Sequence, residues 1–337
     1  MANKKRNIGI DLIKIIACVL VIMLHSLDPT EPVVVNNTFN LSLYYMGTLA
    51  IPVFFMASGY FVLNKASISY AYSFKRIKNI LIVVISWLFL YSLIVFVFKH
   101  KFTFLNEIEG SAFTGVPDGH FYHFWFFWAL MLMLLIAPIL VWVLQKSFKY
   151  FIALIIVVTI ICLIQDISLH MGYAYLMRNT PQVFRINIWI EYYLLGGLVG
   201  NAHFNQIKTF VEKHFVQFSI LDILLYVTLI MYSLWNRQII GWAYAEANYN
   251  NILVMLISII SMTLFATSQP RALKVIEYVI SATMGIYILQ SFVIGKLGKL
   301  GIFSMYPSLL IPVVFVVCLI LVEIALRIPW VNRLFKL

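Results

Sequence analysis

Long apolar runs, separated by short polar connections, leave this chain few ways to fold. Each run has about 17 to 22 residues, the length that a helix needs to cross roughly 30 Å of hydrocarbon. Of the 337 residues, 63% are hydrophobic and only 11% are charged, whereas about a quarter of a soluble domain is charged. The sequence therefore predicts an all-α integral membrane protein, a polytopic bundle of about ten transmembrane helices.

The predicted spans divide the chain evenly. They cover residues 8–27, 42–63, 79–98, 122–144, 150–167, 184–201, 217–234, 250–267, 278–295 and 306–326. No internal repeat, low-complexity tract or Pro/Gly/Ser-rich linker separates them. We therefore expect a single integral membrane domain over residues 1–337, without an appended soluble domain.

Lysine and arginine residues indicate which way the bundle faces. Sixteen of the 24 lie in the termini and in the connections near 64–78, 145–149, 202–216 and 268–277, against seven on the other side. Because positive charge stays in the cytoplasm, both termini are predicted to be cytoplasmic. The basic N-terminus and the apolar run after it could also form a signal peptide, but no small-residue cleavage site ends that run, which favours a retained first helix.

The net charge of +11 is explained mainly by this topology signal and by attraction to anionic headgroups. Membrane lipid is therefore an expected partner, and nucleic acid is not. Cys18, Cys162 and Cys318 lie in different spans and lack the paired spacing of zinc or redox sites. We expect these cysteines to be packing residues, and we expect no metal.

Three ionisable side chains lie in the first span, where each costs about 2.5 to 3.5 kcal/mol on insertion scales. Asp11 and Lys14 are three residues apart and share a helix face. Lys14 and His25 are roughly 16 Å apart along the axis and about 20° from alignment. One stripe is therefore predicted to carry a cation at one end and an imidazole at the other. Simpler interpretations stay open: Lys14 snorkels to the headgroups, Asp11 is a first-turn acid, and the interface wets His25.

Two segments near the second span favour either packing or ligand binding. Ala57, Ser58 and Gly59 remove side-chain bulk, so that another helix or a ligand can approach the backbone, although helix packing is the usual reason. Lys75 and Arg76, in the connection that follows, are either a topology signal or a cluster that holds the phosphates of a nucleotide.

Polar side chains in later spans are also candidates. His123 and Trp125 open the fourth span among other aromatic residues, and an aromatic belt with a wetted histidine explains that pattern on composition alone. Glu191 and Gln290 fall inside predicted spans and are harder to explain without a function. We predict that these four residues and Ser58 contact a substrate.

Taken in order, these segments resemble the acyltransferase-3 family of bacterial membrane O-acyltransferases, most closely its compact members. The first helix of that family carries an acid, a basic residue, ten further residues and a histidine. Asp11, Lys14 and His25 keep this spacing, with lysine where arginine is usual. The resemblance continues through residues 52–60, 74–76, 123–127, 192–197 and 281–287, so that it covers nearly the whole chain.

The resemblance implies a bacterial plasma-membrane enzyme that moves an acetyl group from cytoplasmic acetyl-CoA to a hydroxyl of a cell-surface glycan or its lipid-linked precursor. Lys14, Lys75 and Arg76 would hold the phosphates of coenzyme A. His25 would be the general base that takes the proton of the acceptor hydroxyl, and Asp11 is the second catalytic candidate.

Two departures from the family pattern affect these expectations. Lys14 offers a point charge where arginine would offer a planar fork for bidentate phosphate binding. Gln290 stands where relatives often have histidine, so it can form hydrogen bonds but cannot relay a proton. The competing prediction is a transporter or flippase of a glycan or lipid precursor, because intramembrane charges also mark transport paths. The order of the motifs, and the lack of an inverted repeat, favour the enzyme.

Overall fold

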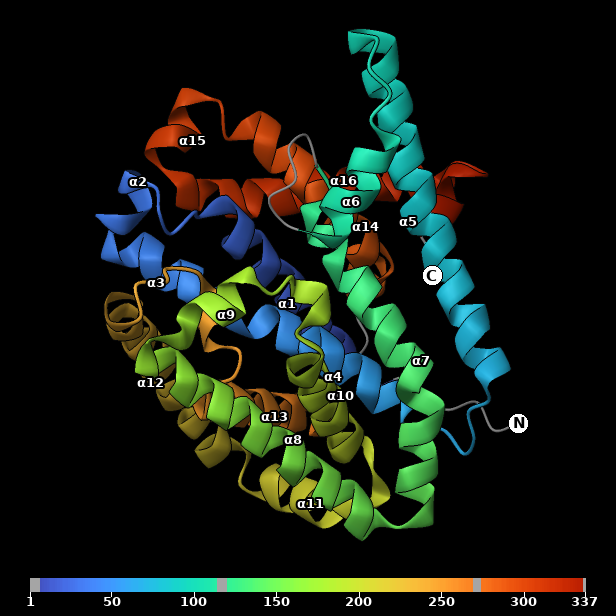
Figure 1. Cartoon of the computed structure of the whole chain (residues 1–337), viewed down its shortest axis with the longest axis vertical. Helices are drawn as coiled ribbons and strands as arrows, with labels where there is room; N and C mark the ends of the chain where they lie inside the picture. The colour runs from blue at the N-terminus through green and yellow to red at the C-terminus, as the bar shows by residue number, and fades with distance from the viewer. Residues whose placement is uncertain (1–6, 114–119, 269–273, 336–337) are drawn as a thin grey trace.

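The computed structural model describes residues 7–113, 120–268 and 274–335, and every regular element in these residues is helical (Figure 1). The α-helices are α1 (Ile8–Ser26), α2 (Pro32–Val35), α3 (Thr38–Met46), α4 (Ala50–Val62), α5 (Tyr70–Lys99), α6 (Phe104–Ala112), α7 (Trp125–Lys146), α8 (Phe148–Ser168), α9 (Ala174–Asn179), α10 (Ile186–Gly200), α11 (Asn205–Lys213), α12 (Phe215–Ile239), α13 (Ile252–Thr267), α14 (Lys274–Leu297), α15 (Gly301–Met305) and α16 (Leu310–Arg327). Short 3-10 or π segments are η1 (Gly47–Leu49), η2 (Tyr122–Phe124), η3 (Leu169–Tyr173), η4 (Gln182–Phe184), η5 (Ala202–Phe204), η6 (Ala245–Asn248), η7 (Pro307–Leu309) and η8 (Val331–Phe335).

The prediction of a polytopic helical membrane bundle is confirmed. In the described residues, 8 segments are long and apolar enough to cross a membrane: Ile8–Ser26, Thr38–Val62, Tyr70–Lys99, Tyr122–Lys146, Phe148–Asn179, Phe215–Ile239, Ile276–Leu297 and Pro307–Arg327. The other two predicted spans form the shorter helices α10 and α13, of 15 and 16 residues. Eight of the ten expected spans are therefore long enough to cross the membrane, and two are shorter helices.

The short helices α10 and α13 lie inside the bundle, and most of their residues are buried. At 1.5 Å per residue they are about 22 and 24 Å long, less than the roughly 30 Å of the hydrocarbon layer. The chain that precedes each helix is therefore η4 or η6 instead of further α-helix. Non-helical backbone at this depth is tolerated where it is buried or lines a cavity. The shortened ends of α10 and α13 leave the space in which the site described below is formed.

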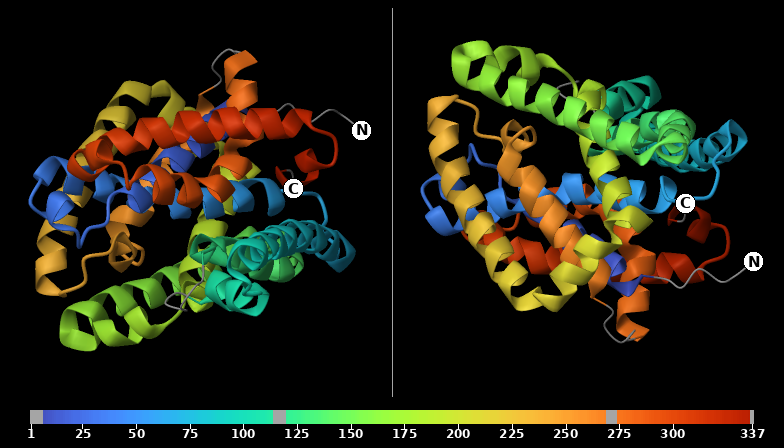
Figure 2. Two further views of the ribbon diagram at one scale, coloured as in Figure 1. Left: turned by 90° about the horizontal axis from the view of Figure 1, so that it is seen from above. Right: turned by 90° about the horizontal axis from the view of Figure 1, so that it is seen from below.

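Figure 2 shows α1 and α4 in the middle of the bundle, with α7 and α8 on one side and α14 and α16 on the other. The Asn7 side chain caps α1, reaches the Tyr60 hydroxyl near the end of α4 and donates to the Ala266 carbonyl near the end of α13. The start of α1 and the ends of α4 and α13 thus share one end of the bundle. This alternation fits the predicted topology, and the cytoplasmic location of the termini stays a prediction.

Helices α4 and α10 cross so closely that no side chain separates them. A Cβ added to Gly59 would lie 1.9 Å from the Tyr193 carbonyl oxygen, and one added to Gly196 would lie 2.0 Å from the Met56 carbonyl oxygen. Small residues allow this approach between membrane helices. Gly59 is therefore a packing residue, which was the simpler of its two interpretations.

We predict that Gly59→Ala lowers the free energy of unfolding by about 1 to 3 kcal/mol, because the added methyl group forces the two helices apart. Gly295→Ala is the matched control, since Gly295 is also helical and a Cβ there would meet nothing within 4 Å. Its unfolding temperature in detergent should stay the same or rise. Equal unfolding temperatures for the two variants would contradict the importance of this crossing.

Candidate active site

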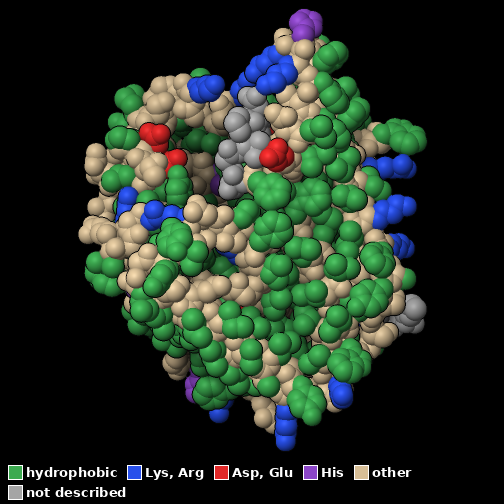
Figure 3. All heavy atoms as spheres, in the orientation of Figure 1, with side chains coloured by type: hydrophobic (Ala, Val, Ile, Leu, Met, Phe, Trp, Pro, Cys, Tyr) green, Lys and Arg blue, Asp and Glu red, His purple; other side chains and the backbone are tan. Residues whose placement is uncertain are grey.

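A pocket of about 550 Å³ lies at the end of the bundle where α1 finishes. Its walls come from the end of α1, the start of α7, η4 with the residue after it, and η6, all of which end or begin at the same depth. Figure 3 shows a hollow on this side of the molecule, bordered by acidic and basic side chains. The pocket is lined by Val21, Leu24, His25, Asp28, Pro29, Tyr44, Ile51, Tyr122, His123, Trp125, Arg178, Gln182, Arg185, Tyr244, Ala245, Glu246, Tyr249 and Tyr287.

His25 stands in the last turn of α1 and is partly buried at the wall of this pocket. Its ring meets the rings of Tyr122 and His123 edge-on, with centroid distances of 5.4 and 6.1 Å. Gln290 approaches the His25 ring from α14. No bond of normal geometry forms between them, because His25 Nδ1 and both amide atoms of Gln290 have no hydrogen-bond partner among the described residues. His25 Nδ1 is therefore buried without a partner, while the ring as a whole is partly exposed at the pocket wall.

His123 is held in the opposite way. Its ring is 1% exposed, Nε2 lies 3.3 Å from the Ile288 carbonyl oxygen, and Nδ1 lies 3.1 Å from the Ser291 hydroxyl. A carbonyl oxygen can only accept, so Nε2 carries the proton and Nδ1 accepts from Ser291. The Tyr287 hydroxyl also donates to the His123 carbonyl. His123 is thus a buried neutral imidazole with both nitrogens engaged, not the wetted belt histidine that composition alone favours.

Trp125 lines the same pocket, and its ring packs on Trp189 at 5.0 Å between centroids. Trp189 in turn donates its indole N–H to the Gln182 carbonyl (2.7 Å), which fixes η4 against α10. The Gln182 side chain is 7% exposed, and its Oε1 has no hydrogen-bond partner among the described residues. A buried acceptor without a partner costs about 1 to 3 kcal/mol.

An ion pair closes another wall of the pocket. Arg185 Nη1 lies 3.0 Å from a carboxylate oxygen of Glu246, and Arg185 Nε donates to the Thr180 carbonyl. Burial raises the pKa of the Glu246 carboxyl, and the Arg185 guanidinium opposes that rise. The ion pair connects the residue after η4 with η6, the two non-α segments that precede α10 and α13.

The other predicted site residues of α1 lie at the far end of that helix. Lys14 Nζ is 2.7 Å from Asp11 Oδ1 and stands 5.8 Å from the centroid of the Phe61 ring. Asp11 is about 21 Å from His25 along the helix axis, so these two catalytic candidates do not share a site. Lys75 and Arg76 are exposed in the first turns of α5.

The stripe between Lys14 and His25 is filled by packing. Cys18 and Val21, which lie on it, are each 1% exposed. The Cys18 thiol lies 3.7 Å from the Thr283 carbonyl of α14. The predicted alignment of cation and imidazole on one helix is present, and α14 covers the surface between them. All three cysteines are free and buried, as packing residues should be.

Three predicted substrate-binding residues, Ser58, Glu191 and Gln290, do not line the pocket, although Gln290 approaches the His25 ring. Ser58 lies about 10 Å along α4 from Ile51, the pocket residue on that helix, toward the end that carries Lys14. Glu191 accepts a hydrogen bond from the Thr159 hydroxyl of α8 (2.6 Å), and its Oε2 is buried without a partner among the described residues. The structure therefore brings His25, His123, Trp125 and Gln290 together, and leaves the roles of all of them as predictions.

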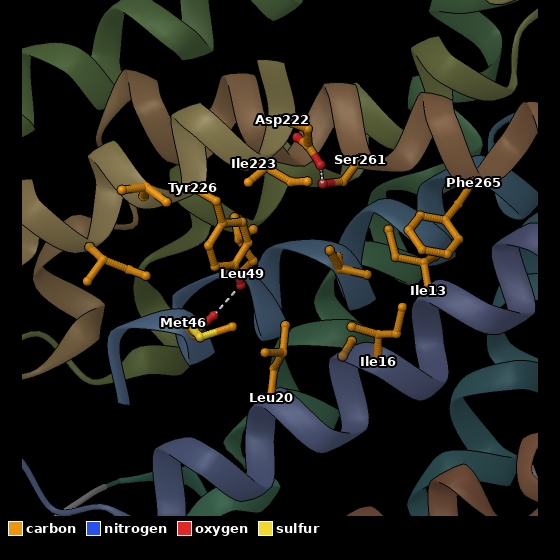
Figure 4. Close-up of a pocket in the computed structure, with 14 residues that line it drawn as sticks. Ile13, Ile16, Leu20, Met46, Leu49, Asp222, Ile223, Tyr226, Ser261 and Phe265 are labelled. Carbon is orange, nitrogen blue, oxygen red and sulfur yellow. Dashed lines mark hydrogen bonds between the residues drawn. The ribbon is translucent and has the colours of Figure 1, made fainter. Parts of the chain in front are cut away.

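A second, apolar cavity of about 430 Å³ separates α1 from α12 (Figure 4). Its few polar groups pair with one another: Ser261 donates to Asp222 (2.6 Å), and the Tyr226 hydroxyl donates to the Met46 carbonyl. Ile13, Ile16, Ala17 and Leu20 form the wall from α1, on a different face of that helix from His25. This cavity is lined mainly by hydrocarbon side chains, and no histidine lines it. Among the described residues, no group of His, Cys, Asp and Glu could hold a metal ion.

Sequence reasoning missed the arginines and the glutamine of the pocket. Arg178 and Arg185 counted only as loop charges, and Gln182 carried no motif. The signal that was available is their place at the start of the predicted span 184–201 or in the connection just before it. Tyr287 and Ser291 flank Gln290 in the sequence and could have been named with it.

Fold and site together define a polytopic helical membrane protein with a histidine pocket at one end of the bundle and a paired lysine near the other. The chain matches the family model described as an acyltransferase domain over residues 7–327. It therefore belongs to the acyltransferase-3 family, and the protein is a membrane acyltransferase. This finding favours the enzyme over the transporter or flippase. No curated protein and no solved structure matches the chain.

We predict that His123→Ala destabilises the fold more than His25→Ala. The first change leaves the Ile288 carbonyl and the Ser291 hydroxyl without their hydrogen-bond partner in a buried environment. Each unsatisfied group lowers the free energy of unfolding by about 1 to 3 kcal/mol. The second change removes a ring whose Nδ1 has no hydrogen bond to lose. Unfolding followed in detergent measures both. Equal losses would contradict the division of roles between the two histidines.

Proposed function

We propose that this protein is an O-acetyltransferase that moves an acetyl group from acetyl-CoA to a hydroxyl of a cell-surface glycan or its lipid-linked precursor in a bacterial plasma membrane. The observation that carries the proposal is the His25 ring, which is partly exposed at the wall of a polar pocket and whose Nδ1 has no hydrogen-bond partner among the described residues. Asp28, Arg178, Gln182 and Glu246 also line this pocket. Such a mixture of donors and acceptors suits a polyhydroxylated sugar.

In the proposed reaction, His25 accepts the proton of the acceptor hydroxyl while that oxygen attacks the carbonyl carbon of the thioester. The new C–O bond forms as the C–S bond breaks. The imidazolium then returns its proton to the departing thiolate, so that the products are the acetyl ester and free coenzyme A. His123 cannot take the proton in this arrangement, because its Nδ1 already accepts from Ser291. Its proposed role is to hold the wall against which His25 and the acceptor lie.

The donor is proposed to enter from the end that carries Lys14, Lys75 and Arg76. Lys14 lies 2.7 Å from Asp11 at this end, and the exposed side chains of Lys75 and Arg76 add to the local attraction for phosphate. The pantetheine arm must cover the roughly 16 Å from Lys14 to His25. Because Cys18 is packed against α14, the arm reaches His25 only if α1 and α14 separate or if it passes beside that stripe.

We predict that His25→Ala abolishes acetyl transfer in a folded, inserted protein. Purified protein in liposomes receives radiolabelled acetyl-CoA and a lipid-linked glycan acceptor, and both acceptor label and free thiol are measured. The parent should label the acceptor and release thiol on the side that bears the N-terminus. His25→Ala and His25→Gln should neither label the acceptor nor release thiol. Near-normal transfer by His25→Ala would remove His25 from the mechanism. Movement of acceptor across the bilayer without thioester cleavage would favour a transporter.

We predict that Lys14→Ala weakens acetyl-CoA binding several-fold, whereas Lys14→Arg retains it, because arginine also offers a cation to phosphate. Lys146→Ala is the matched control, since Lys146 also stacks on an aromatic ring, Trp142, at 4.9 Å. Binding is measured by calorimetry in nanodiscs. If Lys14→Ala and Arg76→Ala both bind acetyl-CoA like the parent, the donor site lies elsewhere and these residues serve topology alone.

A further inference from the structure

Two guanidinium groups meet one indole ring at the edge of the His25 pocket. The guanidinium carbons of Arg178 and Arg185 stand 5.6 and 5.3 Å from the centroid of Trp242. Both arginines line the pocket, and Trp242 is 6% exposed. A buried indole between two cations fixes the planes of both guanidinium groups, because cation–π attraction is strongest over the ring face. Arg178, Arg185 and Trp242 are called the arginine–tryptophan cluster below.

The two arginines of the cluster differ in what balances their charge. Arg185 is 5% exposed and forms an ion pair with Glu246 at 3.0 Å. Arg178 is exposed, and its Nη2 donates to the carbonyls of Ile240 and Gly241. No carboxylate of the described chain forms an ion pair with it. Arg178 is therefore a fixed cation whose Nε and Nη1 remain available.

The remaining charges near the pocket do not cancel this cation. Asp28 also lines the pocket, and its Oδ1 accepts from the backbone and hydroxyl of Thr30. Arg237 donates to the Pro29 carbonyl at the same edge, and its Nη1 is buried without a partner in the described part of the chain. Two guanidinium groups, Arg178 and Arg185, thus line the pocket with two carboxylates, Asp28 and Glu246. Glu246 is paired with Arg185, and Arg178 has no ion-pair partner among the described residues.

We propose that the arginine–tryptophan cluster is a subsite for an oxyanion, a carboxylate or phosphate group, carried by the acceptor whose hydroxyl lies at His25. This inference rests on the proposed function and narrows its substrate class to acidic or phosphorylated saccharides. Arg178 would give the anion single charge-assisted hydrogen bonds from Nε or Nη1, because Nη2 already donates to the Ile240 and Gly241 carbonyls. Trp242 keeps the guanidinium oriented, so that little rotamer entropy is lost on binding.

A lipid headgroup offers the same chemistry from another source. The position of the cluster favours the saccharide, because Arg178 and Arg185 line one cavity of about 550 Å³ with His25. A cavity of this size holds a small ligand beside His25, and a saccharide brings its hydroxyl and its anion on one molecule, which a headgroup phosphate does not. One acceptor can then place its hydroxyl at His25 and its anion at Arg178 at the same time.

The test measures binding without acetyl-CoA, in nanodiscs made only of phosphatidylcholine. The probes are methyl glucuronoside, glucose 1-phosphate and the neutral methyl glucoside. Both anionic probes should bind at least about tenfold more tightly than methyl glucoside, since charge-assisted hydrogen bonds are about twice as strong as neutral ones. Arg178→Gln should remove this preference and leave the affinity for methyl glucoside unchanged. Arg178→Lys should keep part of it.

Arg333→Gln is the matched control, because Arg333 is also an exposed arginine stacked on a tryptophan, Trp330, at 4.7 Å, and it lies outside the pocket. This variant should keep the full preference. Equal binding of all three probes by the parent, no binding of either anionic probe, or an unchanged preference in Arg178→Gln would each overturn the subsite. Loss of the preference when phosphatidylglycerol is added would assign the cluster to lipid headgroups and overturn it as well.

The outcome separates this inference from the proposed function. Acetyl transfer to a glycan acceptor is measured on the same preparations with acetyl-CoA present. Anion preference without any transfer leaves the subsite in place and contradicts the O-acetyltransferase. Transfer without anion preference keeps the O-acetyltransferase and removes the subsite.

Discussion

The contact between α4 and α10, backbone against backbone, is the constraint on which the rest of the bundle depends. Gly59 and Gly196 allow a short, buried α10 to lie directly on α4. Because α10 is shielded from lipid by other helices, it does not need to span the hydrocarbon layer. Its outer end can therefore begin below the surface, and the freed depth becomes the pocket that receives His25. A bulkier crossing would push α10 outward and close or distort that space.

Hydrogen bonding, more than proximity, separates the roles of the two histidines in this pocket. His123 is deeper, and the groups around it accept or donate at each of its ring nitrogens. His25 has fewer contacts, and its Nδ1 has no hydrogen-bond partner among the described residues, as the proposed role in proton transfer requires. The missing hydrogen bond at His25 Nδ1, beside His123 with both ring nitrogens bonded, is therefore what marks His25 as the candidate for chemistry.

The sequence predicted the elements of this fold and part of the site, for identifiable reasons. Apolar length and charge placement depend on lipid and water alone, so the spans and the stripe from Lys14 to His25 were readable. The partners of a side chain depend on tertiary packing, so the sequence could not tell that Glu191 faces α8 or that Ser58 lies at the Lys14 end. Arg178 was missed because an arginine after an apolar run is ordinarily a topology signal.

The closed stripe between Lys14 and His25 also has a chemical consequence. In the proposed reaction a thioester and an acceptor hydroxyl would approach from opposite ends of α1, and the packed face between Lys14 and His25 lies on that route. Cys18 forms this packing with the Thr283 carbonyl of α14, and a buried thiol in an apolar setting is unreactive. On the route between the two helices, the proposed donor would reach His25 only after the α1–α14 contact opens, and the closed contact would keep the thioester apart from the pocket until then.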